Sequence, residues 1–174
     1  FNNFAKINKN VVRVWSEILK SIKNSKLILK SSIPLQTINI KNQFKKYGVL
    51  DSIIFSGSKP FKEHLNLYNS IDICLDTFPY NGVTTSFEAL WMGVPVLTMK
   101  GYNFNSRCGE SINKNLNLMS MIADDENDYI SKAKEFLDKE KLVNTRNIVF
   151  NNLLKSPLFD GKKFSKEFLG SLEA

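Results

Sequence analysis

The chain has 174 residues, of which 43% are hydrophobic and 24% are charged, and these values are typical of one soluble globular domain. The formal net charge is +7, but the lysines are spread along the chain, so we interpret most of them as solvated surface residues. The sequence shows neither an apolar run of about 18 residues nor a signal peptide, which excludes a membrane span and predicts a cytoplasmic protein.

Hydrophobic periodicity predicts helices that alternate with short buried strands. Apolar residues between Val11 and Ile22 recur at helical spacing, and Gly48 is well placed to end a second helix. The predicted elements, in chain order, are a helix at 11–22, a strand at 26–30, a helix at 37–47, a strand at 52–56, a helix at 61–69, a strand at 71–75, a helix at 84–92, a strand at 95–99, a helix at 106–115 and a strand at 118–123. This alternation indicates β-α-β units. We therefore predict a Rossmann-like α/β fold, with a mostly parallel sheet and helices on both faces.

After Ala123 the pattern becomes purely helical. The predicted closing helices cover 124–138, 141–154 and 164–172. The acidic run Asp124-Asp125-Glu126 favours a helix N-cap over a metal site. Because no linker or internal repeat divides the sequence, we predict a single domain over residues 1–174.

The loop at 76–85 is the best candidate for a ligand site, because ligands of open parallel sheets bind at the carboxyl ends of the strands. Gly82 removes a side-chain obstacle to close backbone approach. Thr84 and Thr85 stand at a predicted helix start, where N–H groups, the helix dipole and two hydroxyls favour a diphosphate. Glu88, about one turn later, is placed to accept hydrogen bonds from ribose hydroxyls.

The same residues permit a purely structural interpretation. The segment Thr85-Ser86-Phe87-Glu88 fits the capping-box pattern, in which threonine and glutamate satisfy the helix end and bind no ligand. Spacing alone leaves both interpretations open.

Other chemical motifs are scarce. The two cysteines, Cys74 and Cys108, have no CxxC spacing, which favours a reducing compartment and disfavours zinc. The sequence has no GxGxxG, no GxxxxGK[ST] and no DxD, so a metal-dependent transferase is disfavoured and we expect no cofactor.

The segment from Asp72 to Gly101, DICLDTFPYNGVTTSFEALWMGVPVLTMKG, resembles the donor-site segment of the O-linked N-acetylglucosamine transferases and their SPINDLY-like relatives, in the bacterial version. The resemblance continues through Ser106-Arg107. It also reaches Phe1–Ile7 at the start of the chain and Ser156–Phe159 near its end, so it spans nearly the whole sequence. The central thirty residues are specific, whereas the flanks are weaker.

The resemblance implies the C-terminal, donor-binding half of a GT-B glycosyltransferase. The expected donor is a nucleoside-diphosphate sugar, UDP-N-acetylglucosamine above all, and the expected reaction is metal-independent inverting O-glycosylation of protein. The acceptor and any general base are expected from a preceding region with helical repeats. Because the chain starts at Phe1 rather than Met, we expect a fragment that is inactive alone.

The family's donor contacts carry over to residues of this chain. Lys6 resembles the lysine that neutralises the diphosphate leaving group, although spacing alone also fits a solvated surface lysine. His64 resembles a nucleoside contact, although it also fits an ordinary surface or cap residue. The remaining implied donor contacts are Asn3 beside the donor, Lys59 near the base, Gly82, Thr84 and Thr85 at the diphosphate, and Glu88 at the ribose.

Three departures leave the sugar open, and one of them, Phe78-Pro79-Tyr80-Asn81, resembles the bacterial and SPINDLY-like version. Val83 stands where the animal enzymes have a histidine, and Phe61 stands where they have a lysine near the base. These departures support an alternative in which the domain only senses a nucleotide. The net charge of +7 supports a second alternative, a basic nucleic-acid-binding domain, although the aromatic–basic pattern of single-strand binders is missing.

Overall fold

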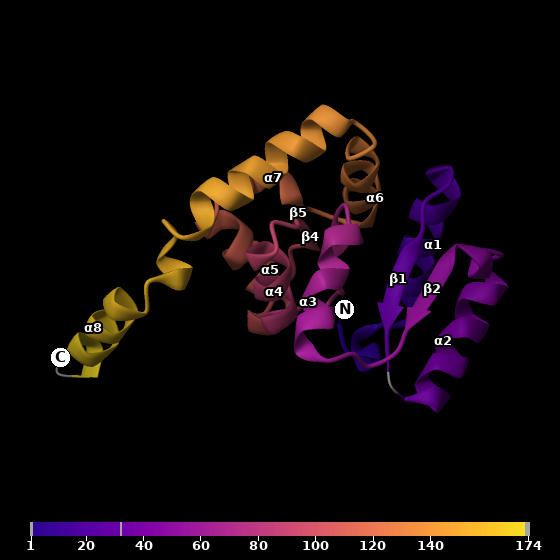
Figure 1. Cartoon of the computed structure of the whole chain (residues 1–174), viewed down its shortest axis with the longest axis horizontal. Helices are drawn as coiled ribbons and strands as arrows, with labels where there is room; N and C mark the ends of the chain where they lie inside the picture. The colour runs from indigo at the N-terminus through magenta and orange to yellow at the C-terminus, as the bar shows by residue number, and fades with distance from the viewer. Residues whose placement is uncertain (1, 32, 173–174) are drawn as a thin grey trace.

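The computed structural model describes residues 2–31 and 33–172 and confirms the predicted alternation of helices and strands (Figure 1). The elements of the alternating part are α1 (Lys9–Ser21), β1 (Leu27–Lys30), α2 (Pro34–Lys46), β2 (Ile53–Ser56), α3 (Phe61–Leu67), β3 (Cys74–Leu75), α4 (Thr84–Trp91), β4 (Val96–Met99), α5 (Phe104–Asn115) and β5 (Ile122–Ala123). The closing helices are α6 (Glu126–Glu135), α7 (Lys139–Leu153) and α8 (Gly161–Leu172). A short 3-10 helix at Phe4–Lys6 precedes α1, and another at Tyr68–Ser70 lies between α3 and β3.

All strand pairs are parallel, as predicted, but the described strands form two sheets rather than one. One sheet has the order β1–β2, with Leu27 opposite Ile53. The other has the order β3–β4–β5, with Cys74 opposite Val96 and Thr98 opposite Ile122. β3 is shorter than predicted, because only Cys74 and Leu75 pair with β4.

Helix ends follow local chemistry. Gly48 has a φ of +70° and follows α2, as its position in the sequence predicted. Asp125 caps α6 by accepting a hydrogen bond from the Asp128 N–H, which confirms the cap interpretation of the acidic run. α2 begins at Pro34, three residues before its predicted start, because proline is tolerated in the first turn of a helix.

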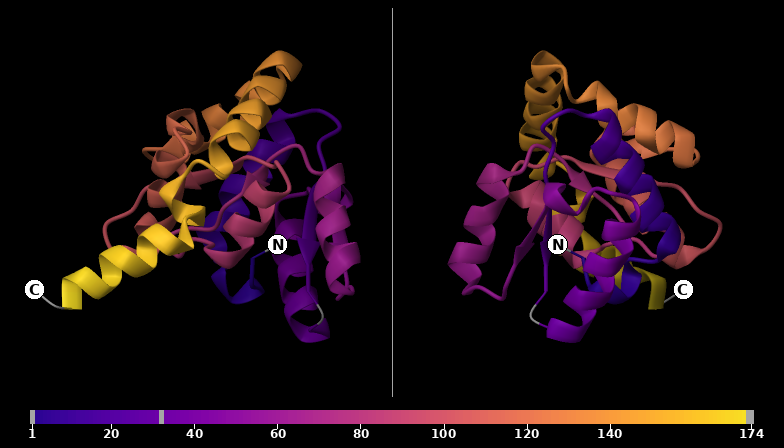
Figure 2. Two further views of the ribbon diagram at one scale, coloured as in Figure 1. Left: turned by 60° about the vertical axis from the view of Figure 1, so that its left-hand side comes forward. Right: turned by 90° about the vertical axis from the view of Figure 1, so that its right-hand side faces the viewer.

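The core lies between the sheets and the helices that cover them. α1 buries Val11, Val14 and Trp15 and packs against α6. α7 packs on α4, whereas α8 extends away from the body (Figure 2). Within the described ranges, no helix is both long and apolar enough to cross a membrane.

Candidate functional site

A buried carboxylate organises the loop that follows β3. Asp76 is 1% exposed, and its Oδ1 accepts hydrogen bonds from the backbone N–H groups of Thr77 at 2.9 Å and Gly82 at 2.7 Å. Oδ1 also accepts from Asn2 Nδ2 at 3.2 Å, and Oδ2 accepts from the Thr98 hydroxyl at 3.0 Å. One side chain therefore closes the loop on itself and ties it to the N-terminal segment and to β4.

Burial also changes the acidity of this carboxyl. Loss of water raises the pKa of Asp76 to about 6, against the opposing effect of the hydrogen bonds from Gly82, Thr98, Thr77 and Asn2. The loop thus contains an acid that titrates near neutral pH although no cation pairs with it among the described residues.

Asn2, in the N-terminal segment before the 3-10 helix at Phe4–Lys6, packs against the 76–85 loop. The Thr85 hydroxyl donates to Asn2 Oδ1 at 2.9 Å. A Cβ on Gly82 would lie 2.7 Å from Asn2 Oδ1 and 2.8 Å from Thr85 Oγ1. A side chain at position 82 would therefore force Asn2 and Thr85 to shift, so glycine is favoured here by the protein's own packing.

The first turn of α4 has no side-chain cap. Its N-cap residue is Val83, and no side chain among the described residues accepts a hydrogen bond there as a cap. Thr85 lies inside the turn and bonds Asn2, so the capping box with Glu88 does not form. Thr84 is exposed at the first position of the helix, beside N–H groups that the helix itself leaves unbonded. This arrangement suits an anion.

Glu88 points to a different set of partners. Its Oε2 lies 3.1 Å from His64 Nε2 and 3.4 Å from the Tyr68 hydroxyl. The His64 and Tyr68 rings meet edge to face, with centroids 5.6 Å apart. His64 is 8% exposed, so its interpretation as a surface residue is wrong. Burial, reinforced by the negative charge of Glu88, raises the pKa of Tyr68 and keeps its hydroxyl protonated.

Lys6 reaches the loop from the 3-10 helix at Phe4–Lys6. Its Nζ donates to the Asn81 carbonyl at 2.9 Å and lies 4.3 Å from the centroid of the Tyr80 ring. Lys6 is therefore a partly buried contact of the loop rather than a solvated surface lysine. The cation stands beside the loop that leads into the first turn of α4.

Two other predicted residues have local roles. The Asn3 side chain caps the 3-10 helix by accepting from the Ala5 N–H at 2.9 Å. Lys59 pairs with Glu63 at 3.9 Å near the start of α3. Surface pairs of this kind contribute little to stability.

The predicted site residues thus form two groups. Lys6 lies with the loop of Gly82, Thr84 and Thr85, whereas His64 lies with Glu88. Sequence reasoning missed the contacts of Asn2, Asp76 and Tyr68. The position of Asp76 directly after a strand was the one available signal. Among the described residues, no three His, Cys, Asp or Glu side chains gather as metal ligands would.

Comparison with known proteins identifies the family of this chain. The profile of glycosyl transferase family 41 matches residues 1–168. A probable UDP-N-acetylglucosamine–peptide N-acetylglucosaminyltransferase SPINDLY of Solanum lycopersicum is 35% identical over 95% of this chain and 18% of its own length. The Caenorhabditis elegans UDP-N-acetylglucosamine–peptide N-acetylglucosaminyltransferase is 32% identical over 94% of this chain and 14% of its own.

The fold matches a solved enzyme as well. A mutant of the Thermobaculum terrenum O-GlcNAc transferase superposes with a TM-score of 0.92 and 29% identity, over 99% of this chain and 34% of that one. The chain therefore spans a fifth or less of the curated relatives named above and about a third of the solved enzyme. Since the family profile covers nearly all of the sequence, the chain belongs to glycosyl transferase family 41.

Proposed function

We propose that this chain is the donor-binding half of a metal-independent inverting glycosyltransferase that transfers N-acetylglucosamine from UDP-N-acetylglucosamine to protein. The observation that carries the proposal is the meeting of Lys6, the 76–85 loop and the uncapped first turn of α4 at the carboxyl end of the β3–β4–β5 sheet. Ligands of open parallel sheets bind at that edge. The names of the relatives support the choice of donor and acceptor class.

The diphosphate would lie over the start of α4. Backbone N–H groups, the helix dipole and the Thr84 hydroxyl favour an anion there, and the Thr85 hydroxyl exchanges its bond to Asn2 Oδ1 for one to a phosphate oxygen. Gly82, buried and bonded to Asp76, lets the loop pack closely beneath the start of α4, and Lys6 exchanges its bond to the Asn81 carbonyl for one to a phosphate oxygen. Negative charge grows on the leaving diphosphate as the glycosidic bond breaks, so these fixed dipoles and this cation stabilise the transition state more than the ground state.

The nucleoside would lie toward α3. A carboxylate has about four acceptor sites, so Glu88 can hold His64 and Tyr68 and still accept from a ribose hydroxyl. In this proposal His64 and Lys59 would contact the base, and Asn3, in the N-terminal segment, would contact the donor. The acceptor protein and the general base would come from a preceding region with helical repeats, and the site needs no other cofactor.

Calorimetry for nucleotide binding and a transfer assay, both on the full-length protein, test the proposal. UDP and UDP-N-acetylglucosamine should bind, and transfer to a protein acceptor should proceed in the presence of a chelator. GDP-fucose, which differs from UDP-N-acetylglucosamine in both sugar and base, tests which donor the site selects. Failure of every nucleotide to bind at millimolar concentration would refute the donor site. Saturable binding without any turnover would favour a nucleotide-sensing module instead, for which the exposed Val83 beside the site is the supporting observation.

A further inference from the structure

The Lys6 ammonium is held by two partners from the same loop. Its Nζ donates to the Asn81 carbonyl at 2.9 Å and lies 4.3 Å from the centroid of the Tyr80 ring. The Tyr80 side chain is 49% exposed, so a substitution there removes little from the core and should leave the fold intact. What the ring does for Lys6 can therefore be separated from what it does for stability.

The carbonyl partner is fixed by three further bonds of its residue. Asn81 is 1% exposed. Its N–H donates to the Asn105 carbonyl at 3.0 Å, its Nδ2 donates to the Thr77 carbonyl at 2.9 Å, and its Oδ1 accepts from the Gly109 N–H at 3.2 Å. Tyr80 is anchored directly before it, because its own carbonyl accepts from the Thr77 hydroxyl at 2.7 Å. Both partners of the ammonium thus belong to a firmly bonded part of the loop.

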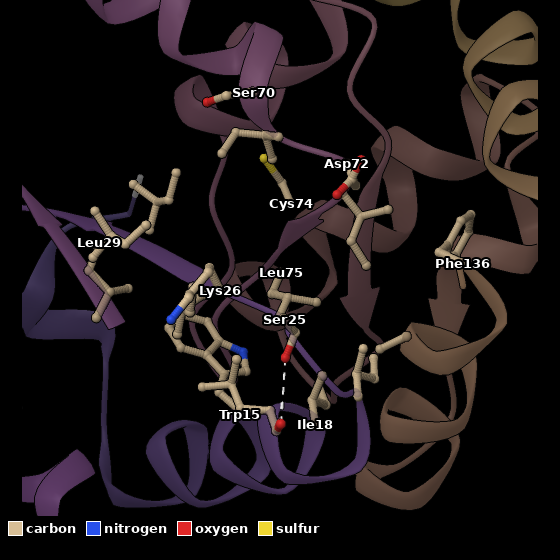
Figure 3. Close-up of a pocket in the computed structure, with 18 of the residues that line it drawn as sticks. Trp15, Ile18, Ser25, Lys26, Leu29, Ser70, Asp72, Cys74, Leu75 and Phe136 are labelled. Atoms are coloured by element: carbon tan, nitrogen blue, oxygen red, sulfur yellow. Dashed lines mark hydrogen bonds between the residues drawn. The ribbon is translucent and has the colours of Figure 1, made fainter. Parts of the chain in front are cut away.

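The N-terminal segment directs Lys6 toward this loop and its neighbours the other way. An apolar cavity of about 700 Å³ lies between β1 and the segment 71–75 (Figure 3). Asn2 and Ile7 line this cavity, whereas Lys6 does not. Because the Lys6 amino group bonds the loop instead, the cation lies on the polar side of the segment, beside the loop that leads into α4.

Neither partner neutralises the charge of Lys6. Among the described residues, the ammonium contacts a carbonyl dipole and a ring face rather than a carboxylate. A carboxylate would compete with an incoming phosphate, because charge-assisted bonds are the strong ones. The attraction between a cation and a ring face is weaker and leaves the ammonium its full charge. When the lysine bond passes from the Asn81 carbonyl to a phosphate, the ring can remain in contact with the ammonium.

We propose that Tyr80 is a positioning residue, which holds the Lys6 ammonium within reach of the donor diphosphate through the face of its ring. This inference rests on the proposed function, because the ring acts through Lys6. A lysine side chain loses much rotational freedom when it is ordered. The ring imposes part of that order before the donor binds, so a lysine without it stabilises the leaving diphosphate less well in the transition state.

Three variants of the full-length protein isolate the ring face. Tyr80→Leu removes it, Tyr80→Phe keeps it, and Tyr102→Leu removes an exposed tyrosine of the loop after β4 as a matched control. The measurement is the rate of nucleoside diphosphate release from UDP-N-acetylglucosamine or GDP-fucose, with thermal unfolding beside it. In Tyr80→Leu, kcat should fall roughly five- to thirtyfold, the scale of a partly desolvated cation–π contact. Tyr80→Phe and Tyr102→Leu should stay within about twofold of wild type, and all three should unfold near the wild-type temperature.

A double-mutant cycle with Lys6→Ala shows whether the ring acts through the lysine. In the Lys6→Ala background, Tyr80→Leu should change kcat by less than about twofold, because residues in contact are not additive. Equal losses in both backgrounds would show that the ring contacts the donor directly, and equal losses in Tyr80→Leu and Tyr80→Phe would assign the effect to the hydroxyl. Either result would overturn the inference. Unchanged turnover in Lys6→Ala would refute the proposed function of the lysine itself, whereas a loss there without one in Tyr80→Leu refutes only the role of Tyr80.

Chemical labelling tests the contact without any turnover. A limiting dose of acetic anhydride acylates amino groups, and mass spectrometry of the full-length protein compares Lys6 with the exposed Lys9. Lys6 should label more slowly than Lys9 in the wild type, because its amino group is held by the carbonyl and the ring. Tyr80→Leu should raise the ratio of Lys6 to Lys9 labelling by at least about threefold, and Tyr80→Phe should not. A ratio that is the same in Tyr80→Leu and in the wild type would overturn the inference.

Discussion

Removal of the Asp76 carboxylate tests how the 76–85 loop is held. Asp76→Ala leaves the N–H groups of Thr77 and Gly82, the Thr98 hydroxyl and the Asn2 amide without their acceptor. A buried donor without a partner costs about 1–3 kcal/mol. Because the side chains of Asn2 and Thr98 can turn toward other partners, the two backbone groups dominate. We expect the free energy of unfolding to fall by about 3–5 kcal/mol.

Asp76→Asn is the matched control. The amide oxygen keeps the acceptor for Thr77, Gly82 and Asn2, and the amide N–H₂ donates to the Thr98 hydroxyl, which can also accept. The expected loss is about 1 kcal/mol or less. Urea unfolding followed by tryptophan fluorescence measures both variants, and UDP calorimetry reports whether the loop still binds. Equal losses for Asp76→Ala and Asp76→Asn would refute the acceptor role.

The same residue predicts a pH dependence. The pKa of Asp76 is about 6 in the folded chain, above an unfolded value of about 3.9, so the folded state binds more protons between these values. Stability therefore falls as pH rises from about 4 to 6, by up to about 3 kcal/mol from this group. Ion pairs such as that of Glu110, whose pKa is lowered to about 2, change stability at lower pH. The difference in free energy of unfolding between wild type and Asp76→Asn therefore isolates the contribution of Asp76. A difference that stays constant across this window would contradict the assignment.

Three further substitutions test the proposed donor contacts in the full-length protein. Gly82→Ala forces a Cβ against Asn2, so it should lower the free energy of unfolding by about 1–3 kcal/mol and weaken UDP binding. Gly57→Ala is the control, because its Cβ meets no atom within 4 Å, and it should change neither stability nor UDP binding. Lys6→Ala should lower kcat on the order of 10²-fold and affect UDP affinity less. The control is Lys9→Ala, because Lys9 is exposed. Unchanged turnover would show that Lys6 only packs against the loop. Glu88→Gln should weaken UDP binding by roughly 1.5–3 kcal/mol with stability nearly intact, and equal affinities of the wild type for UDP, 2′-deoxy-UDP and 3′-deoxy-UDP would exclude the ribose contact.

The sequence by itself determined the succession of elements and most of their ends. Hydrophobic period, a glycine after α2 and an acidic cap before α6 are local signals, because they depend on residues within a few positions of one another. The donor-segment resemblance likewise identified the family, since it rests on one continuous stretch of chain that the family profile includes.

Only the tertiary structure decided which residues meet. Asp76 and Asn2 are 74 positions apart, and Thr85 and Asn2 are 83 apart, so their contact depends on how the strands are ordered in space. The Thr85–Glu88 spacing fitted a capping box equally well, and the partners that excluded it, Asn2 and His64, lie on other elements. The division of the strands between two sheets was also invisible in the pattern, because periodicity predicts a strand but not its neighbour.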